Sequence, residues 1–224
     1  MGIQITANKT RVLDPLADAR TFEALPMVVV YRGLGPEYKD SYRWDTADWM
    51  VRQIQNAMPK ELLNKVILVV PDDYRVDCGI CLHQAEQLIG KKRSVSFYSL
   101  CGYSRGGERV YKNLRLRAWR ILGLIDAVSP TMEGYLNKVV DDFATKIRCV
   151  YNIRNWGTPP KEGKRRESFT KGEKNYETLT TFYDHLKDLN VKMVDAMDVR
   201  HPDTNNHADM PALFFKTYGR DLTQ

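Results

Sequence analysis

The sequence predicts an α/β fold in which a mostly parallel sheet carries helices on both faces, as a single domain over residues 1–224. Short β-branched runs alternate with segments of helical periodicity along most of the chain, and this alternation is typical of a parallel sheet covered by helices. The composition, with 43% hydrophobic and 28% charged residues, is that of an ordinary globular domain. No linker, internal repeat or low-complexity segment interrupts the pattern.

The first strand is expected at 27–31, where the run MVVVY is apolar and β-branched. The turn residues RGLGP follow, and either Asp45 or Thr46 can then cap a helix. Pro59 lies at the end of that helix. Its apolar positions step by three and four, as one buried face requires: Ala47, Met50, Val51, Ile54 and Met58.

The same reasoning places the remaining elements in alternating order. Further strands are expected at 65–71, 94–102, 120–128, 147–153 and 191–197. Further helices are expected at about 81–88, 107–116, 131–145, 176–189 and 209–218.

The charge pattern argues against a nucleic-acid partner. The net charge is +6, which favours only weak attraction to anionic molecules. The densest basic stretch, 161–174, contains three glutamates and one aromatic residue, Phe169. A single-strand binding groove interleaves several aromatic side chains with its basic residues, so we expect a solvated loop here.

Membrane and compartment signals are also weak. The chain has no run of 18 apolar residues, so no transmembrane segment is expected, and its first residues lack the apolar core of a secretory signal. Its four cysteines form no dense disulfide framework. We therefore expect reduced thiols and a cytoplasmic location.

The motif GYSRGG joins the strand expected at 94–102 to the helix expected at 107–116. A sharp strand-to-helix turn needs small neighbours, and Gly102 and Gly106 supply them on either side of Ser104. Such a turn lifts the serine oxygen out of the sheet and exposes it, as in a nucleophile elbow. Ser104 is therefore the candidate nucleophile.

In this context Gly102-Tyr103-Ser104-Arg105-Gly106-Gly107 resembles the nucleophile elbow of the α/β-hydrolase superfamily. The resemblance extends over the element order from about residue 27 to the C-terminus. It implies an esterase-like or lipase-like serine hydrolase, which cleaves a carboxylic ester of a small molecule or lipid through a Ser-His-Asp triad and an acyl-enzyme. It calls for no cofactor and no metal.

The resemblance places the general base after the last strand, where two histidines, His201 and His207, occur. It favours His207, which we expect on a polar loop just before the last helix. The other histidines, His83 and His185, fall on expected helices and are interpreted as solvated or structural.

The acid of the triad is less clearly marked. In the family it often follows the second strand after the nucleophile, but here no carboxylate follows that strand before Glu162. Asp126 instead ends the preceding apolar strand, in LIDAVSP, and a carboxylate at that place needs a partner. We expect Asp126 to orient the histidine; the alternatives are Asp203, Asp198 and Glu162, with Asp126 then capping a loop.

The negative charge that develops during attack needs backbone donors. The resemblance assigns one to the N–H of Arg105. The second is expected in the loop after the first strand, from Gly33 or Leu34, or from Arg32 beside them.

Three other interpretations stay open. Cys78 and Cys81 have the spacing of a redox pair, although seven residues, 71–77, separate Val70 of the preceding strand from the first thiol. With His83 they can begin a zinc site. A metal site can also be drawn from the histidine-rich segment: His201, Asp203, His207 and Asp209. Folds of this type also serve as non-catalytic binding modules.

Overall fold

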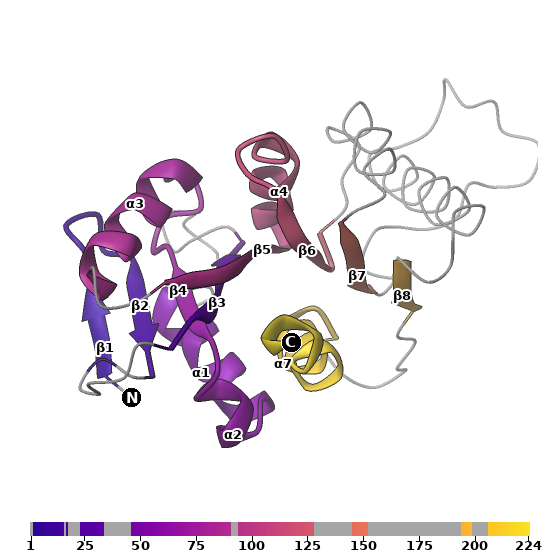
Figure 1. Ribbon diagram of the computed structural model, residues 1–224. Coiled ribbons are helices and arrows are strands. Elements are labelled where there is room, and N and C mark those ends of the chain that lie inside the picture. The colour runs from indigo at the N-terminus through magenta and orange to yellow at the C-terminus, as the bar shows by residue number, and fades with distance from the viewer. Residues whose placement is uncertain are drawn as a thin grey trace, which may run out of the picture.

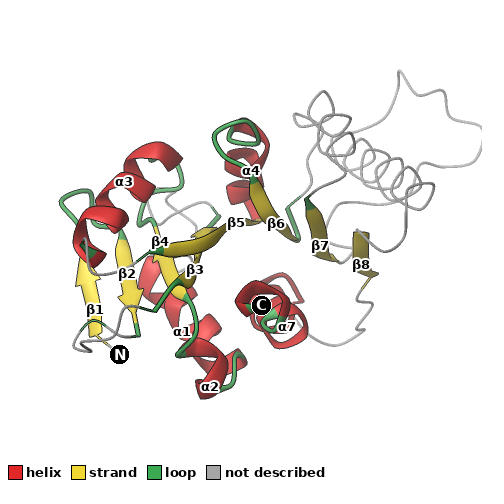
Figure 2. Cartoon of the chain, viewed as in Figure 1, coloured by secondary structure: helices red, strands yellow, loops and turns green. Residues whose placement is uncertain are grey.

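The computed structural model describes residues 2–15, 17, 23–33, 46–90, 94–127, 145–151, 194–198 and 206–224. Within these residues eight strands form one sheet, in the order β1-β2-β4-β3-β5-β6-β7-β8 (Figures 1 and 2). The six strands from β3 to β8 all pair in parallel, and only β1 and β2 run antiparallel to their neighbours. The predicted mostly parallel α/β sheet is confirmed.

The elements follow the chain in the predicted alternation. The strands are β1 (Gly2–Ile5), β2 (Arg11–Asp14), β3 (Leu25–Tyr31), β4 (Ile67–Val70), β5 (Val95–Tyr103), β6 (Trp119–Ile125), β7 (Lys146–Tyr151) and β8 (Val194–Asp198). The described helices are α1 (Ala47–Ala57), α2 (Lys60–Leu63), α3 (Cys78–Ile89), η1 (Ser104–Gly106), α4 (Gly107–Lys112), α7 (Asn206–Tyr218) and η5 (Asp221–Thr223).

Helices cover both faces of the sheet. In Figure 1, α3 and α4 lie on one side of the strands, and α1, α2 and α7 lie on the other. Successive residues of β3 therefore enter different cores: Val29 packs with the α3 and α4 side, whereas Val30 packs with the α1 and α7 side. All seven residues of β3 are buried, which explains why this strand is a continuous apolar run.

The first helix follows its sequence pattern closely. Thr46 is the N-cap of α1, and its side chain accepts a hydrogen bond from the Trp49 backbone N–H at 3.1 Å. The five predicted apolar positions are all buried, and the helix ends before Pro59.

The N-terminal hairpin was not predicted. Each of β1 and β2 has only four residues, and β2 contributes two apolar side chains, Val12 and Leu13. Lys9 adopts a φ of 60° in the turn between the strands. So short a segment shows no periodicity, and its strand state depends on pairing with β4.

Three helix boundaries differ from prediction. Asp77 caps α3 by accepting from the Ile80 backbone N–H at 3.2 Å, so this helix begins at Cys78 instead of about residue 81. Helix α4 ends at Lys112, before the expected 116. Helix α7 begins at Asn206, so His207 lies in its first turn and not on a preceding loop.

The short helix α2 was also missed, and the helices expected at 131–145 and 176–189 lie outside the described residues. In the part of the chain that the structure describes, no helix has the length and apolar character needed to cross a membrane.

Gly123 in the middle of β6 allows α7 to pack closely on the sheet. A Cβ atom at this position would lie 2.5 Å from the Cys101 Sγ on β5 and 2.7 Å from the Phe214 ring on α7. Both distances are far below van der Waals contact, and Phe214 is fully buried. The approach of α7, which carries His207, therefore depends on the missing side chain.

We expect Gly123→Ala to lower the free energy of unfolding by ~1–3 kcal/mol, because the added methyl group overpacks this contact. Urea denaturation followed by circular dichroism measures the change. Ser96→Ala, at an exposed position of the neighbouring strand β5, is the control and should change stability little. Equal stability of Gly123→Ala and wild type would contradict the close packing.

Candidate active site

Ser104 lies at a strained turn directly after β5. Its φ is 52°, in the left-handed region that residues with a Cβ rarely adopt. It begins the short helix η1, which continues into α4, and its side chain is partly exposed. This is the strand-turn-helix geometry expected of a nucleophile elbow.

The two glycines of the motif are required by close backbone contacts. A Cβ at Gly102 would lie 2.6 Å from the carbonyl oxygen of Gly106. A Cβ at Gly106 would lie 2.5 Å from the carbonyl oxygens of Tyr31 and Arg32. The turn that carries Ser104 is therefore packed against itself and against the loop that follows β3.

Asp126 and His207, which are 81 positions apart, form a hydrogen-bonded pair. The Nδ1 atom of His207 lies 2.6 Å from the Oδ2 atom of Asp126. The Asp126 side chain is fully buried, and that of His207 is 33% exposed. The structure thus brings together the two residues that the sequence analysis had proposed as acid and base.

This contact determines how the imidazole is oriented. An ionised carboxylate only accepts hydrogen bonds, so the contact with an ionised Asp126 selects the His207 tautomer that carries its proton on Nδ1. In the neutral ring Nε2 then holds the lone pair. The backbone of Asp126 is also fixed, since its N–H donates to the Val150 carbonyl of β7 at 2.7 Å and its φ is 45°.

Tyr103, which immediately precedes Ser104, contacts the same histidine. Its ring centroid lies 4.8 Å from that of His207, at an interplanar angle of 31°. Its hydroxyl donates to the main-chain carbonyl of His207 at 3.0 Å. The sequence motif does not predict this contact, because it joins residues that are 104 positions apart.

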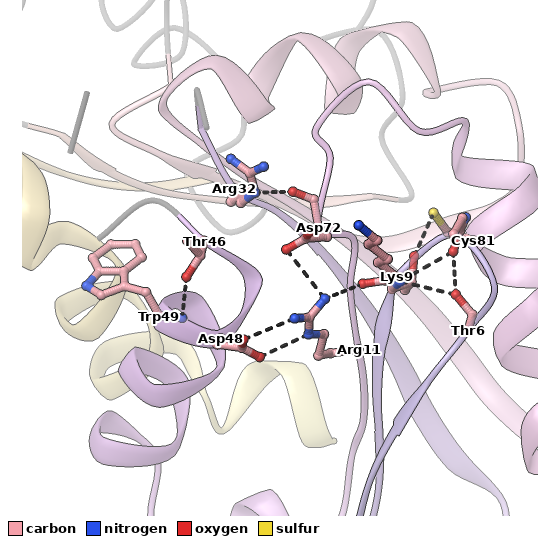
Figure 3. Close-up of polar contacts among 11 residues, drawn as sticks. Thr6, Lys9, Arg11, Arg32, Thr46, Asp48, Trp49, Asp72 and Cys81 are labelled. Atoms are coloured by element: carbon pink, nitrogen blue, oxygen red, sulfur yellow. Dashed lines mark hydrogen bonds and ion pairs between the residues drawn. The ribbon is translucent and has the colours of Figure 1, made fainter. Parts of the chain in front are cut away.

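The loop after β3 is held by a buried side chain that the sequence analysis also missed. The Arg32 guanidinium donates from Nε to the Asp72 carbonyl and from Nη1 to the Gly33 carbonyl, the latter at 3.3 Å. Figure 3 shows that Asp72 also contacts Arg11 of β2, which pairs with Asp48 of α1. Residues 32 and 33 are therefore braced beside the Ser104 turn.

Of the expected oxyanion donors, Arg105 and Gly33 are described and Leu34 is not. The Arg105 side chain is exposed and pairs with Glu108 at 2.7 Å. Gly33 is buried, and its neighbour Arg32 touches the elbow at Gly106. The two backbone segments assigned to the oxyanion hole are thus close to one another.

The rival histidine and most rival carboxylates fall outside the described residues. This holds for His201, Asp203 and Glu162, and also for His185. Asp198 ends β8, where it pairs with Tyr151 of β7. His83 is exposed on α3, as expected.

The thiol and metal interpretations gain no support. Cys78 and Cys81 are fully buried free thiols, and burial raises the pKa of Cys78 to about 12. A thiol that stays protonated at neutral pH is a poor redox nucleophile. Among the described residues no three His, Cys, Asp or Glu side chains gather as a metal site would require.

No family model and no curated protein matches this sequence. Solved structures do match its fold. The siderophore hydrolase EstB from Aspergillus nidulans aligns with a TM-score of 0.56 at 10% identity, over 99% of this chain and 94% of EstB. The siderophore hydrolase EstA from the same organism has a TM-score of 0.55 at 10% identity, over 99% and 93%.

A third similar structure is Est1E from Butyrivibrio proteoclasticus, with a TM-score of 0.52, 12% identity and 99% coverage of both chains. Structural likeness with so little sequence identity establishes the fold and leaves the activity open. The strand order, the parallel sheet with helices on both faces and these likenesses agree with the resemblance inferred from GYSRGG. The chain has the α/β-hydrolase fold.

Proposed function

We propose that this protein is a serine hydrolase that cleaves a carboxylic ester through an acyl-enzyme. The observation that carries the proposal is the pair formed by Asp126 and His207 beside the strained turn of Ser104. The three residues also occur in the order Ser, Asp, His along the chain, which is the order of α/β-hydrolase triads.

In this mechanism Ser104 Oγ attacks the ester carbonyl while His207 Nε2 accepts the hydroxyl proton. The imidazolium that forms is stabilised by the buried carboxylate of Asp126. The proton then passes to the alcohol oxygen as the C–O bond breaks, which leaves Ser104 acylated. In the second half, His207 Nε2 accepts a proton from water as the water attacks the acyl carbonyl. The proton then returns to Ser104 Oγ as the carboxylic acid leaves.

Backbone N–H groups stabilise the negative charge on the carbonyl oxygen during both steps. We assign one donor to Arg105 and the other to the loop of Gly33 and Leu34. The contact between Gly106 and the carbonyls of Tyr31 and Arg32 supports this assignment, because it joins the two segments.

For the substrate we propose an ester of a small molecule or a lipid. Two structures of similar fold are described as siderophore hydrolases, which supports hydrolysis as the class of reaction. The alternative is a non-catalytic module with the same fold, and a serine-directed fluorophosphonate separates the two, because only an activated serine reacts with it.

The first prediction concerns the nucleophile. Ser104→Ala should abolish fluorophosphonate labelling and lower hydrolysis of p-nitrophenyl esters by ~10³–10⁶-fold, with the fold intact by circular dichroism. Ser96→Ala, also on β5, should keep both. Near-normal turnover by Ser104→Ala would rule out the proposed reaction.

The second prediction concerns the base. His207→Ala should lower kcat/KM by ~10²–10⁴-fold, whereas His83→Ala on the exposed face of α3 should not. Because only a neutral imidazole accepts the serine proton, wild-type kcat/KM should fall on acidification. If His201→Ala loses activity and His207→Ala retains it, the base was assigned to the wrong histidine.

The third prediction concerns the acid. Asp126→Asn should lower kcat by ~10²–10⁴-fold with little change in KM, because the amide favours the wrong imidazole tautomer and leaves the imidazolium without a counter-charge. Asp209→Asn, at an exposed position on α7, is the matched control. A kcat of Asp126→Asn close to wild type would transfer the role to another carboxylate.

A further inference from the structure

Helix α7 contains a proline, Pro211, four residues after the proposed base His207. In an α-helix the carbonyl of each residue accepts from the N–H four residues later. The residue four positions after His207 is Pro211, which lies inside α7. Proline has no N–H, and its ring pushes against the carbonyl four residues before it. The carbonyl of His207 therefore has no helical donor at the usual position.

Tyr103 supplies a donor to this carbonyl from outside the helix. Its hydroxyl donates to the His207 oxygen at 3.0 Å. Tyr103 is only 1% exposed, and its hydrogen bond to His207 is partly buried. A carbonyl shielded from water and left without a donor is costly, and the Tyr103 hydroxyl reduces that cost.

The hydrogen bond also links the histidine to the strand that carries the nucleophile. Tyr103 is the last residue of β5, directly before Ser104, and it pairs with Ile125 of β6, directly before Asp126. His207 is thus held at two points by neighbouring strand ends. Asp126 binds its ring nitrogen, and Tyr103 binds its main chain and packs against its ring in a tilted arrangement.

We propose that Tyr103 is a positioning residue, whose hydroxyl replaces the helical donor that Pro211 lacks and so holds His207 in place relative to Ser104. This inference rests on the proposed function. The positioning role belongs to the hydroxyl and is separate from the packing role of the ring. The Tyr103 ring contacts Trp49 of α1 in the core, and a phenylalanine ring would fill that space equally well.

A double-mutant cycle tests the proposal. Tyr103→Phe keeps the ring and removes the hydroxyl, so kcat for a p-nitrophenyl ester should fall about tenfold while KM changes less than about twofold. Pro211→Ala restores an N–H four residues after His207. In that background the same Tyr103→Phe change should cost less than about threefold in kcat, because the helix now supplies the donor.

Tyr218→Phe is the matched control. Tyr218 is also buried on the α7 side, and its hydroxyl donates to a main-chain carbonyl, that of Cys149, at 3.4 Å. Its loss should lower stability in urea without lowering kcat, and should not couple to Pro211→Ala. If Pro211→Ala folds poorly, Pro211→Ser restores the same N–H for the cycle.

Two outcomes would overturn the inference: a kcat of Tyr103→Phe within twofold of wild type, or an equal cost of Tyr103→Phe with Pro211 and with Ala at that position. A change in stability alone would assign Tyr103 to packing. Fluorophosphonate labelling of Ser104 in each variant keeps these results separate from the proposed function. Labelling that persists with an unaffected kcat would reject only the role of Tyr103, whereas failure to label wild type would reject the hydrolase.

Discussion

The carboxylate of Asp126 is the group on which the candidate site depends. An ionised carboxylate buried this fully loses its hydration, at a cost of several kcal/mol that groups paired with it must offset. His207 is one such partner, and it is carried by a helix that begins 80 residues later than Asp126. Helix α7 must therefore dock at the end of β6, and Gly123 in the same strand leaves room for it.

The strain at Ser104 is tolerated for a related reason. A non-glycine residue at φ 52° costs on the order of 1–3 kcal/mol and persists only where its surroundings leave no alternative. Here the strand before it is fixed by pairing on both sides, and the turn after it is packed against the carbonyls of Tyr31 and Arg32. The backbone at the turn is thus held in one conformation, which is what the proposed role of Ser104 as a nucleophile requires.

Much of the fold and part of the candidate site could be predicted from the sequence, and the features that could not be predicted have physical causes. The strands β3 and β4 are buried runs rich in β-branched residues, and Asp126 directly follows the mostly apolar strand β6. The hairpin of β1 and β2 was missed because its strand state comes from pairing and not from its own residues. The Tyr103 and Arg32 contacts join distant segments, which periodicity cannot reveal. Pro211, four residues after His207, was the one readable signal that this carbonyl needs another donor.

The parallel register explains why residues so far apart in the chain converge. In the sheet β3, β5 and β6 are neighbours, and their carboxyl ends lie at one edge, with Tyr31 paired to Gly102 and Tyr103 to Ile125. The next residue of each strand belongs to the candidate site: Arg32, Ser104 and Asp126. Ligands of open α/β sheets bind at this edge. The sheet alone thus positions the proposed nucleophile, the proposed acid and one segment of the proposed oxyanion hole, whereas the position of the proposed base depends on the docking of α7. Loss of that docking would leave Ser104 without its proposed proton acceptor, so in the proposed mechanism the contacts of α7 with Asp126, Tyr103 and Gly123 matter to the chemistry as much as to stability.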